Sequence, residues 1–153
     1  MRAVPFCPEE ETFGTPRATP NIHGGDGFDV LDGRAGVISD AGDDWTGALL
    51  RSVLKMKDIA DEHHVDLALL MDMSAACGST VIYEGPRRLK VYRQGPGVAA
   101  AVLIRAGIPV VRQRDEGTLG LLFTKLGVGT DVPFTDRADH HERRWYRDYF
   151  RLR

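Results

Sequence analysis

Residues 65–79, VDLALLMDMSAACGS, are the most informative stretch of the chain. The first nine of them are nearly all apolar, and so short an apolar run is typical of a β-strand buried on both faces. The small residues at 74–79 predict a loop at the carboxyl end of that strand. Ligands of open α/β sheets bind at such loops. The stretch therefore predicts a central parallel strand with a binding loop attached.

The segments around this strand alternate between helix and strand. Apolar residues recur at near-helical spacing in the segment that ends at His63. Pro96 suits the first turn of the next helix and Gly107 its end. The alternation predicts an α/β fold: a small open parallel sheet with flanking helices, Rossmann-like and three-layered. The expected elements are helices at residues 46–63, 96–106 and 117–126, strands at 65–73 and 108–112, and a hairpin from 81–83 and 89–92.

The two ends of the chain differ from this middle part. Residues 4–6 predict a strand-like stub, whereas residues 8–45 are rich in Gly, Pro, Asp and Thr and predict mostly irregular loop, with a short strand at 36–39. A last helix is expected at residues 138–152. We therefore expect an α/β domain at residues 1–115 and a helical C-terminal extension at 116–153 that packs on it.

Composition excludes several classes of protein. The chain has 153 residues and a net charge of −2, so it is not a strongly basic nucleic-acid-coating protein. No apolar run approaches the ~20 residues of a membrane span, and the start has no signal-peptide core. We therefore expect a cytoplasmic protein without a membrane partner. The reducing cytosol disfavours a disulfide between its two cysteines, Cys7 and Cys77.

Taken alone, the residues that carry chemistry leave alternatives open. Cys7 and Cys77 each follow a predicted strand, so both thiols can meet at one site, but free cysteines are also common core residues. The segment RRWYR at residues 143–147 mixes guanidinium and aromatic groups that can stack on nucleobases. The other interpretation is a helix that packs Trp145, Tyr149 and Phe150 onto the domain.

A set of short motifs in a fixed order is more specific than any one of them. Together they resemble the bacterial domain-of-unknown-function family 523, which includes thiouracil desulfidases, and the resemblance covers about residues 4–112. The motifs are CPE at residues 7–9, TPR at 15–17, GGDG at 24–27, VLDG at 30–33 and SAACGS at 74–79, with Tyr83 soon after.

The resemblance implies a cofactor and a reaction. Desulfidases of this family hold a [4Fe–4S] cluster by three cysteines and leave one iron open for the sulfur of a thiolated nucleobase. Cys7 and Cys77 match two of these ligands, Glu9 matches the catalytic acid/base and Ser74 the catalytic serine. Backbone N–H groups near Gly78 would bond to the cluster sulfurs. The implied reaction is hydrolytic removal of sulfur from a thiolated pyrimidine, without redox change.

One departure from the family pattern is important, because the third cysteine is absent from this sequence. Four explanations are open. Met1 is an internal residue of a longer protein; or the chain is a natural short form whose third ligand is His23, a carboxylate or an external thiol. Otherwise a homodimer shares one cluster, or the cluster has been lost. In the last case we expect a non-catalytic domain that binds a nucleobase or RNA, or that dimerises.

Overall fold

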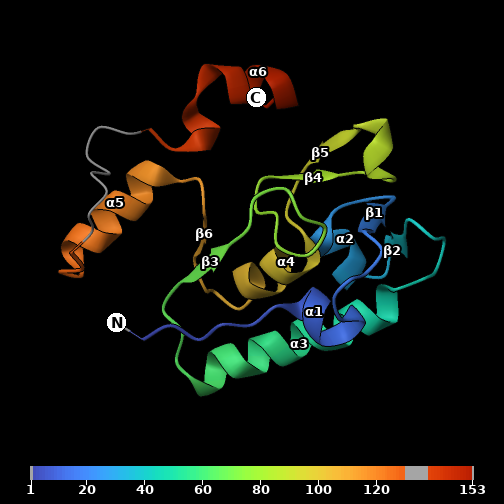
Figure 1. Cartoon of the computed structure of the whole chain (residues 1–153), viewed down its shortest axis with the longest axis horizontal. Coiled ribbons are helices and arrows are strands. Elements are labelled where there is room, and N and C mark those ends of the chain that lie inside the picture. Colours follow the sequence, from blue (N-terminus) through green and yellow to red (C-terminus); the bar gives the residue numbers. More distant parts are fainter. Residues whose placement is uncertain (1, 130–137, 153) are drawn as a thin grey trace.

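The computed structural model describes residues 2–129 and 138–152, and within them the strands form three two-stranded sheets (Figure 1). Only one of these pairs is parallel, and it joins strands about 40 residues apart in the sequence. The pairs are β1 (Pro20–His23) with β2 (Gly36–Ser39), antiparallel; β3 (Ala68–Leu70) with β6 (Val110–Arg112), parallel; and β4 (Val81–Tyr83) with β5 (Tyr92–Gln94), antiparallel.

The most buried helix lies in the middle of the molecule, and the pairs β1–β2 and β4–β5 lie toward one edge (Figure 1). The helices are α1 (Pro8–Phe13), α2 (Gly27–Leu31), α3 (Thr46–Glu62), α4 (Val98–Arg105), α5 (Glu116–Lys125) and α6 (Arg144–Phe150), with 3-10 turns η1 (Arg87–Leu89) and η2 (His140–Glu142).

Helix α4 is the centre of the core. Its sequence, VAAAVLIR, is apolar on nearly every side, which is typical of a helix surrounded by protein. The six residues from Val98 to Leu103 are all buried, and the helix packs against both α2 and α3. Small alanine side chains let these neighbours approach closely, so α4 fixes the positions of the elements around it.

Helix α3 is amphipathic and covers one side of this core. Leu49, Val53, Met56 and Ala60 recur three or four residues apart and are buried, whereas Leu54, on the opposite face, is half exposed. Helix α1 lies against α3, and the Ser52 hydroxyl donates to the Pro8 carbonyl at 2.9 Å. The long helix therefore supports the start of α1.

The structure confirms an α/β fold with a parallel strand pair and the three predicted helices. It corrects the central strand, because β3 has three residues and Leu69 and Met71 are each more than half exposed. Among the described strands, β3 pairs only with β6. The exposure of Leu69 and Met71 shows that the face of the pair on which they lie is not covered. The described sheets are too small to confirm a three-layer, Rossmann-like arrangement.

The N-terminal prediction of irregular loop is wrong. Residues 8–45 contain α1, β1 and α2 as well as the expected strand β2, whereas residues 4–6 form no strand. Helix α2 is held by a capping box in which the Asp26 carboxylate accepts from the Phe28 and Asp29 amides. The acidic, glycine-rich stretch at residues 24–33 is therefore accounted for by helix capping.

The last predicted helix is interrupted. Residue Arg143 has an extended backbone (φ −69°, ψ 131°) that ends η2 and precedes α6, so the expected helix is two short pieces. Strand β5 begins three residues later than predicted because η1 occupies the turn. The predicted extension at 116–153 includes residues 130–137 and 153, which lie outside the described part of the chain.

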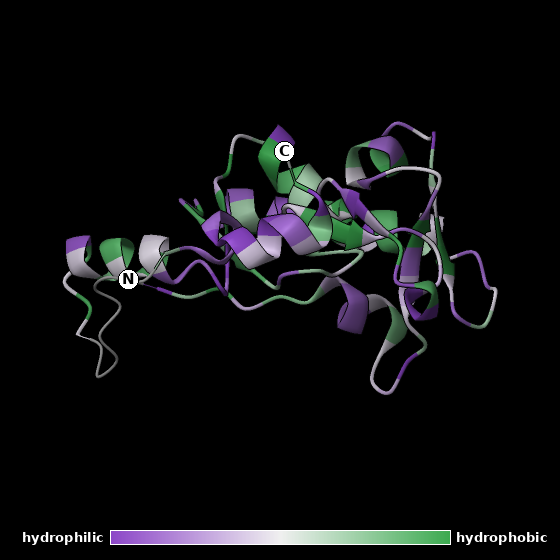
Figure 2. Cartoon of the chain, turned by 90° about the horizontal axis from the view of Figure 1, so that it is seen from above, coloured by the Kyte–Doolittle hydropathy of each residue, from purple (hydrophilic) through white to green (hydrophobic). Residues whose placement is uncertain are grey.

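Helix α5 projects to one side of the molecule (Figure 2), and of its residues only Leu119 is buried. In the described part of the chain, no helix has the length and apolarity needed to cross a lipid bilayer.

Candidate functional site

The first turn of α1 carries two of the predicted site residues. Cys7 is the N-cap, and its Sγ accepts a hydrogen bond from the Glu10 amide at 3.4 Å. Pro8 at the first helical position and three acidic residues in the first turn suit the positive end of the helix dipole. The Cys7 thiol therefore lies at a helix start, exposed, with Glu9 one residue into the helix.

Ser74 joins this turn to the loop of residues 71–79. Its hydroxyl donates to Glu9 Oε1 at 2.9 Å, across 65 residues of sequence, and its Oγ accepts from the Ala76 and Cys77 amides at 3.1 and 3.2 Å. Ser74 is buried, so these bonds are shielded from water. One side chain therefore fixes both the Cys77 backbone and the Glu9 carboxylate.

The loop rests on the beginning of α4. The Val98 amide donates to the Ala75 carbonyl at 2.9 Å, and the Ala99 amide to the Ala76 carbonyl at 2.8 Å. These bonds satisfy N–H groups that have no partner within the helix. A Cβ at Gly97 would lie 2.5 Å from both loop carbonyl oxygens, so only glycine allows this approach. The site loop is thereby part of the cap of the core helix.

Glu9 has a second partner, Arg17. The Arg17 guanidinium lies 3.1 Å from Glu9 Oε2, and both side chains are largely shielded, with exposures of 23% and 15%. Each carboxylate oxygen of Glu9 is thus held by a different group. Arg17 belongs to the quoted TPR motif, but no feature of the motif indicates that it pairs with Glu9.

Cys77 is the more enclosed of the two thiols. Burial, together with the charges of the nearby Glu9 and Cys7, raises its pKa to about 12, and a hydrogen bond from the Met71 amide opposes this only in part. The side chain is therefore a protonated thiol at neutral pH, and a bound metal would have to displace the proton. Ser74 bonds both Glu9 and the Cys77 amide, and the charges of Glu9 and Cys7 act on the Cys77 thiol. The structure therefore brings these four residues to one place.

This group of side chains contains two thiols of the kind that hold iron–sulfur clusters. Cluster irons are held chiefly by cysteine thiolates, which Cys7 and Cys77 provide. Across residues 2–129 and 138–152, no His, Cys, Asp or Glu side chain joins both cysteines in a three-donor group. His23, considered as a third ligand, instead lines a separate pocket. The described residues fit a cluster in part and leave its ligand set incomplete.

The glycine after Cys77 is required by packing. A Cβ at Gly78 would lie 2.8 Å from the Ser74 carbonyl oxygen and 2.9 Å from that of Val81. The Gly78 N–H donates to the Ser74 carbonyl at 2.8 Å, within the loop itself. Its predicted role toward cluster sulfurs stays a prediction.

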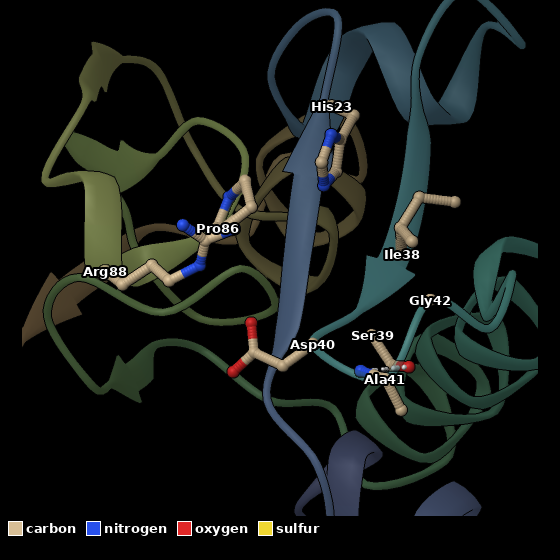
Figure 3. Close-up of a pocket in the computed structure, with 8 residues that line it drawn as sticks. All are labelled: His23, Ile38, Ser39, Asp40, Ala41, Gly42, Pro86 and Arg88. Atoms are coloured by element: carbon tan, nitrogen blue, oxygen red, sulfur yellow. Dashed lines mark hydrogen bonds between the residues drawn. The ribbon is translucent and has the colours of Figure 1, made fainter.

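The pocket that contains His23 lies between the β1–β2 hairpin and η1 and has a volume of about 500 Å³ (Figure 3). None of Cys7, Glu9, Ser74 and Cys77 lines it. The pocket is lined by His23, Ile38, Ser39, Asp40, Ala41, Gly42, Pro86 and Arg88.

The C-terminal aromatic residues differ from the expected packing. Tyr146 is the buried residue of α6, while Trp145 and Tyr149 are 53% and 58% exposed. Tyr146 and Phe150 are four residues apart and their ring centroids lie 4.6 Å from each other, so they share the helix face turned to the domain. Phe150 and Tyr149 nevertheless contact the Tyr92 ring of β5, with ring centroids 4.8 and 5.6 Å away, so the predicted packing is confirmed for these two residues. It is wrong for Trp145, and sequence reasoning missed Tyr146.

Comparison with known proteins is consistent with this arrangement. A family model described as 2-thiouracil desulfurase matches residues 1–115. The uncharacterized protein YbbK of Bacillus subtilis (strain 168) is 36% identical over 115 residues, which are 74% of this chain and 76% of YbbK. A solved structure of TudS, a [4Fe–4S]-dependent thiouracil desulfidase, superposes with a TM-score of 0.65 at 30% identity, covering 81% of this chain and 76% of TudS.

Proposed function

Because this chain belongs to the 2-thiouracil desulfurase family, we propose that it is an enzyme that removes sulfur from a thiolated pyrimidine base. The observation that carries the proposal is the hydrogen bond of 2.9 Å between Ser74 and Glu9. It unites the acid of the CPE motif and the serine of the SAACGS motif, which lie far apart in the sequence. The structural likeness to TudS supports the substrate class.

The proposed reaction is a hydrolysis in which no atom changes its oxidation state. The oxygen of a water replaces the sulfur at the ring carbon, and the sulfur leaves as hydrogen sulfide. Glu9 takes the two protons of the attacking water one after the other and passes each to the departing sulfur, so that the ring keeps a carbonyl oxygen. Ser74 holds the Glu9 carboxylate in place and hydrogen-bonds the substrate, while Arg17 keeps the other carboxylate oxygen fixed.

We further propose that Cys7 and Cys77 are two ligands of a [4Fe–4S] cluster. When bound, the cluster would supply a Lewis-acidic, thiophilic iron. The chain's own contribution is to hold the two thiols: Cys7 at the start of α1 and Cys77 in the loop on α4. The complete ligand set needs another group, which the described residues do not place beside them.

The cofactor part is tested by iron and sulfide analysis with a visible spectrum, on protein reconstituted without oxygen. We expect about four irons per chain, as in a cubane cluster, with absorbance near 400 nm, and loss of both in Cys77→Ala. About two irons per chain would indicate a cluster shared by two chains. Absence of iron would contradict the cofactor assignment and favour a domain that binds a nucleobase without catalysis.

The catalytic part is tested by following the ultraviolet spectrum of 2-thiouracil and the release of sulfide. Replacing Glu9 by Gln should lower kcat about 100-fold, because a general acid/base contributes at least that factor. Glu10→Gln is the matched control: the residue lies next to Glu9 in the same helical turn, and its side chain is exposed. Equal activity of the Glu9 and Glu10 variants would refute the role of Glu9.

A further inference from the structure

We propose that residues 138–152, which lie beyond the family match, clamp the site loop of residues 71–79, and that Tyr146 is the positioning residue of this clamp. The inference rests on the proposed function, because the loop carries Ser74 and Cys77. The family model ends at residue 115, so the clamp is a property of this chain's C-terminal segment. Two separate ties connect the segment to the two ends of the loop.

The first tie holds the start of the loop. The Tyr146 hydroxyl donates to the Asp72 carboxylate, with distances of 3.3 and 3.2 Å to its two oxygens. Tyr146 and Asp72 are buried, with exposures of 1% and 7%. A buried carboxylate without a hydrogen-bond donor is strongly destabilising, so this bond is important for the stability of the contact. Burial and the Asp72 charge also raise the pKa of Tyr146, which keeps the hydroxyl protonated as a donor.

The second tie holds the end of the loop through Arg112, the last residue of β6. The Arg112 guanidinium contacts the Thr80 hydroxyl, and its Nε lies 2.8 Å from Asp115 Oδ2. The same guanidinium contacts His141 Nδ1, which lies 3.1 Å from Asp115 Oδ1. The side chain of Arg112 is 6% exposed. Thr80, directly after the loop, is therefore connected to the C-terminal segment through one buried cation.

A third carboxylate completes the attachment of the segment. The Asp139 carboxylate accepts from the Thr118 amide at 2.8 Å and from the Thr118 hydroxyl at 2.5 Å. Donor atoms of Asp115, Asp139 and His141 lie within 4.8 Å of one another, a grouping that resembles a metal site. Since Arg112 and Thr118 already donate to these carboxylates, the grouping is explained by the clamp and needs no cation.

The loop has a reason to need holding. Between the two ties, Met73 has a left-handed backbone (φ +57°), a strained conformation for a residue with a Cβ. It lies between Asp72, the first anchor, and Ser74, which bonds Glu9. If Asp72 were released, Met73 would be free to relax and Ser74 would shift with it. The clamp thus keeps the serine hydroxyl directed at the acid.

The test is amide hydrogen exchange of the protein without cofactor or substrate, comparing Tyr146→Phe with Tyr149→Phe. Both changes remove one hydroxyl from α6, but the Tyr149 hydroxyl faces Tyr92 at 3.2 Å and not the loop. We expect the Ala76 and Cys77 amides, which donate to Ser74, to exchange about tenfold faster in Tyr146→Phe, the factor typical of losing one hydrogen bond to a buried charge. Tyr149→Phe should exchange like the unmodified protein.

Two results would overturn the clamp. One is unchanged exchange at these amides in Tyr146→Phe; the other is equal acceleration in the loop and in α3, which would indicate a general loss of stability. Asp72→Asn provides a second route if Tyr146→Phe does not fold, because it keeps an acceptor of the same size but removes the charge. It should accelerate the same two amides, by a smaller factor.

A kinetic measurement separates this inference from the proposed function. In reconstituted enzyme, loss of positioning should lower kcat for 2-thiouracil more than it raises KM, since Ser74 and Glu9 act during the reaction. If the unmodified protein does not turn over thiouracil, the proposed function is contradicted, but the hydrogen-exchange measurement still tests the clamp. With turnover but no exchange difference, the clamp fails and the proposed function stands.

Discussion

Helix α4 and helix α6 lie in one chain but are held by different forces. Six consecutive residues of α4 are buried among apolar neighbours, whereas α6 is anchored by one buried tyrosine, a few charged partners and a group of aromatic rings. The hydrophobic effect has no preferred direction and grows roughly in proportion to the apolar area that is buried. Hydrogen bonds to buried charges depend strongly on geometry. We infer that the first region determines whether the chain folds, and the second how well the site is aligned.

The largest expected effect tests the apolar side of this comparison. Leu49→Ala, at a fully buried position of α3, should lower the free energy of unfolding by about 3 kcal/mol, because it removes buried methyl groups and leaves a cavity. Leu54→Ala, five residues later in the same helix and 50% exposed, should change it by less than about 0.5 kcal/mol. Denaturant unfolding measures both. Similar losses in the two variants would disprove the assigned core face.

A smaller effect is expected where the core meets the site. Gly97→Ala would place a Cβ against the Ala75 and Ala76 carbonyl oxygens, and we expect a loss of about 2 kcal/mol from this overpacking. Because the same carbonyls belong to the site loop, thiouracil turnover should fall as well.

Gly47→Ala is the control for this change. Its nearest atom is the flexible end of Arg51 at 3.7 Å, and alanine favours a helix, so stability should stay equal or rise slightly. A Gly97→Ala protein as stable and active as the Gly47 variant would show that the loop and α4 do not need to approach so closely.

The smallest effect concerns the C-terminal region and is pH-dependent. Burial lowers the pKa of His140 below the usual 6.5, and the positive charges of Arg114 and Arg143 lower it further. The negative charges of Asp72 and Glu116 oppose this shift only in part. The Nδ1 of His140 is buried and has no hydrogen-bond partner among the residues that the structure describes. On acidification the unfolded chain therefore takes up a proton at this residue before the folded chain does, and stability is lost as pH falls through about 6.5.

His140→Gln should remove this component. We expect the thermal midpoint of the unmodified protein to fall more between pH 7.5 and pH 5.5 than that of the variant. The protection factors of the α6 amides, which are corrected for the slower intrinsic exchange at lower pH, should fall over the same interval in the unmodified protein only. Parallel midpoints in the two proteins would mean that His140 does not couple pH to the attachment of the segment.

The comparison also explains what the sequence could predict. Helix α3 follows from apolar spacing because its stabilising contacts lie on the face that the sequence pattern itself defines. Helix α4 follows instead from an apolar run that ends at Gly107. Helix α1 and helix α2 have five or six residues, too few for such a pattern, and depend on caps and on tertiary contacts such as that between Ser52 and Pro8. Strand β3 was predicted too long because its apolar residues were assumed to be covered on both faces.

The candidate site followed from motif resemblance more than from physics. Cys7, Glu9, Ser74 and Cys77 were identified in this way, and the structure places them together. Tyr146 was missed because it acts through a partner far along the chain, Asp72, at a separation of 74 residues. Arg17 was missed although its partner is only eight residues away, because the pair forms only through the turn after α1, which has no sequence pattern of its own. The division into residues 1–115 and 116–153 stays a prediction, as does a homodimer.

The bonds between the site loop and α4 have a consequence for protein engineering. They close the base of the segment that contains β4, η1 and β5, so the two ends of this segment are fixed by the core. Its tip, the four residues at 87–90, is exposed. Lengthening a loop whose ends are already fixed costs little, since closure entropy grows only with the logarithm of length. A peptide tag or fluorescent reporter inserted at this tip would leave both the core helix and the site loop as anchored as before.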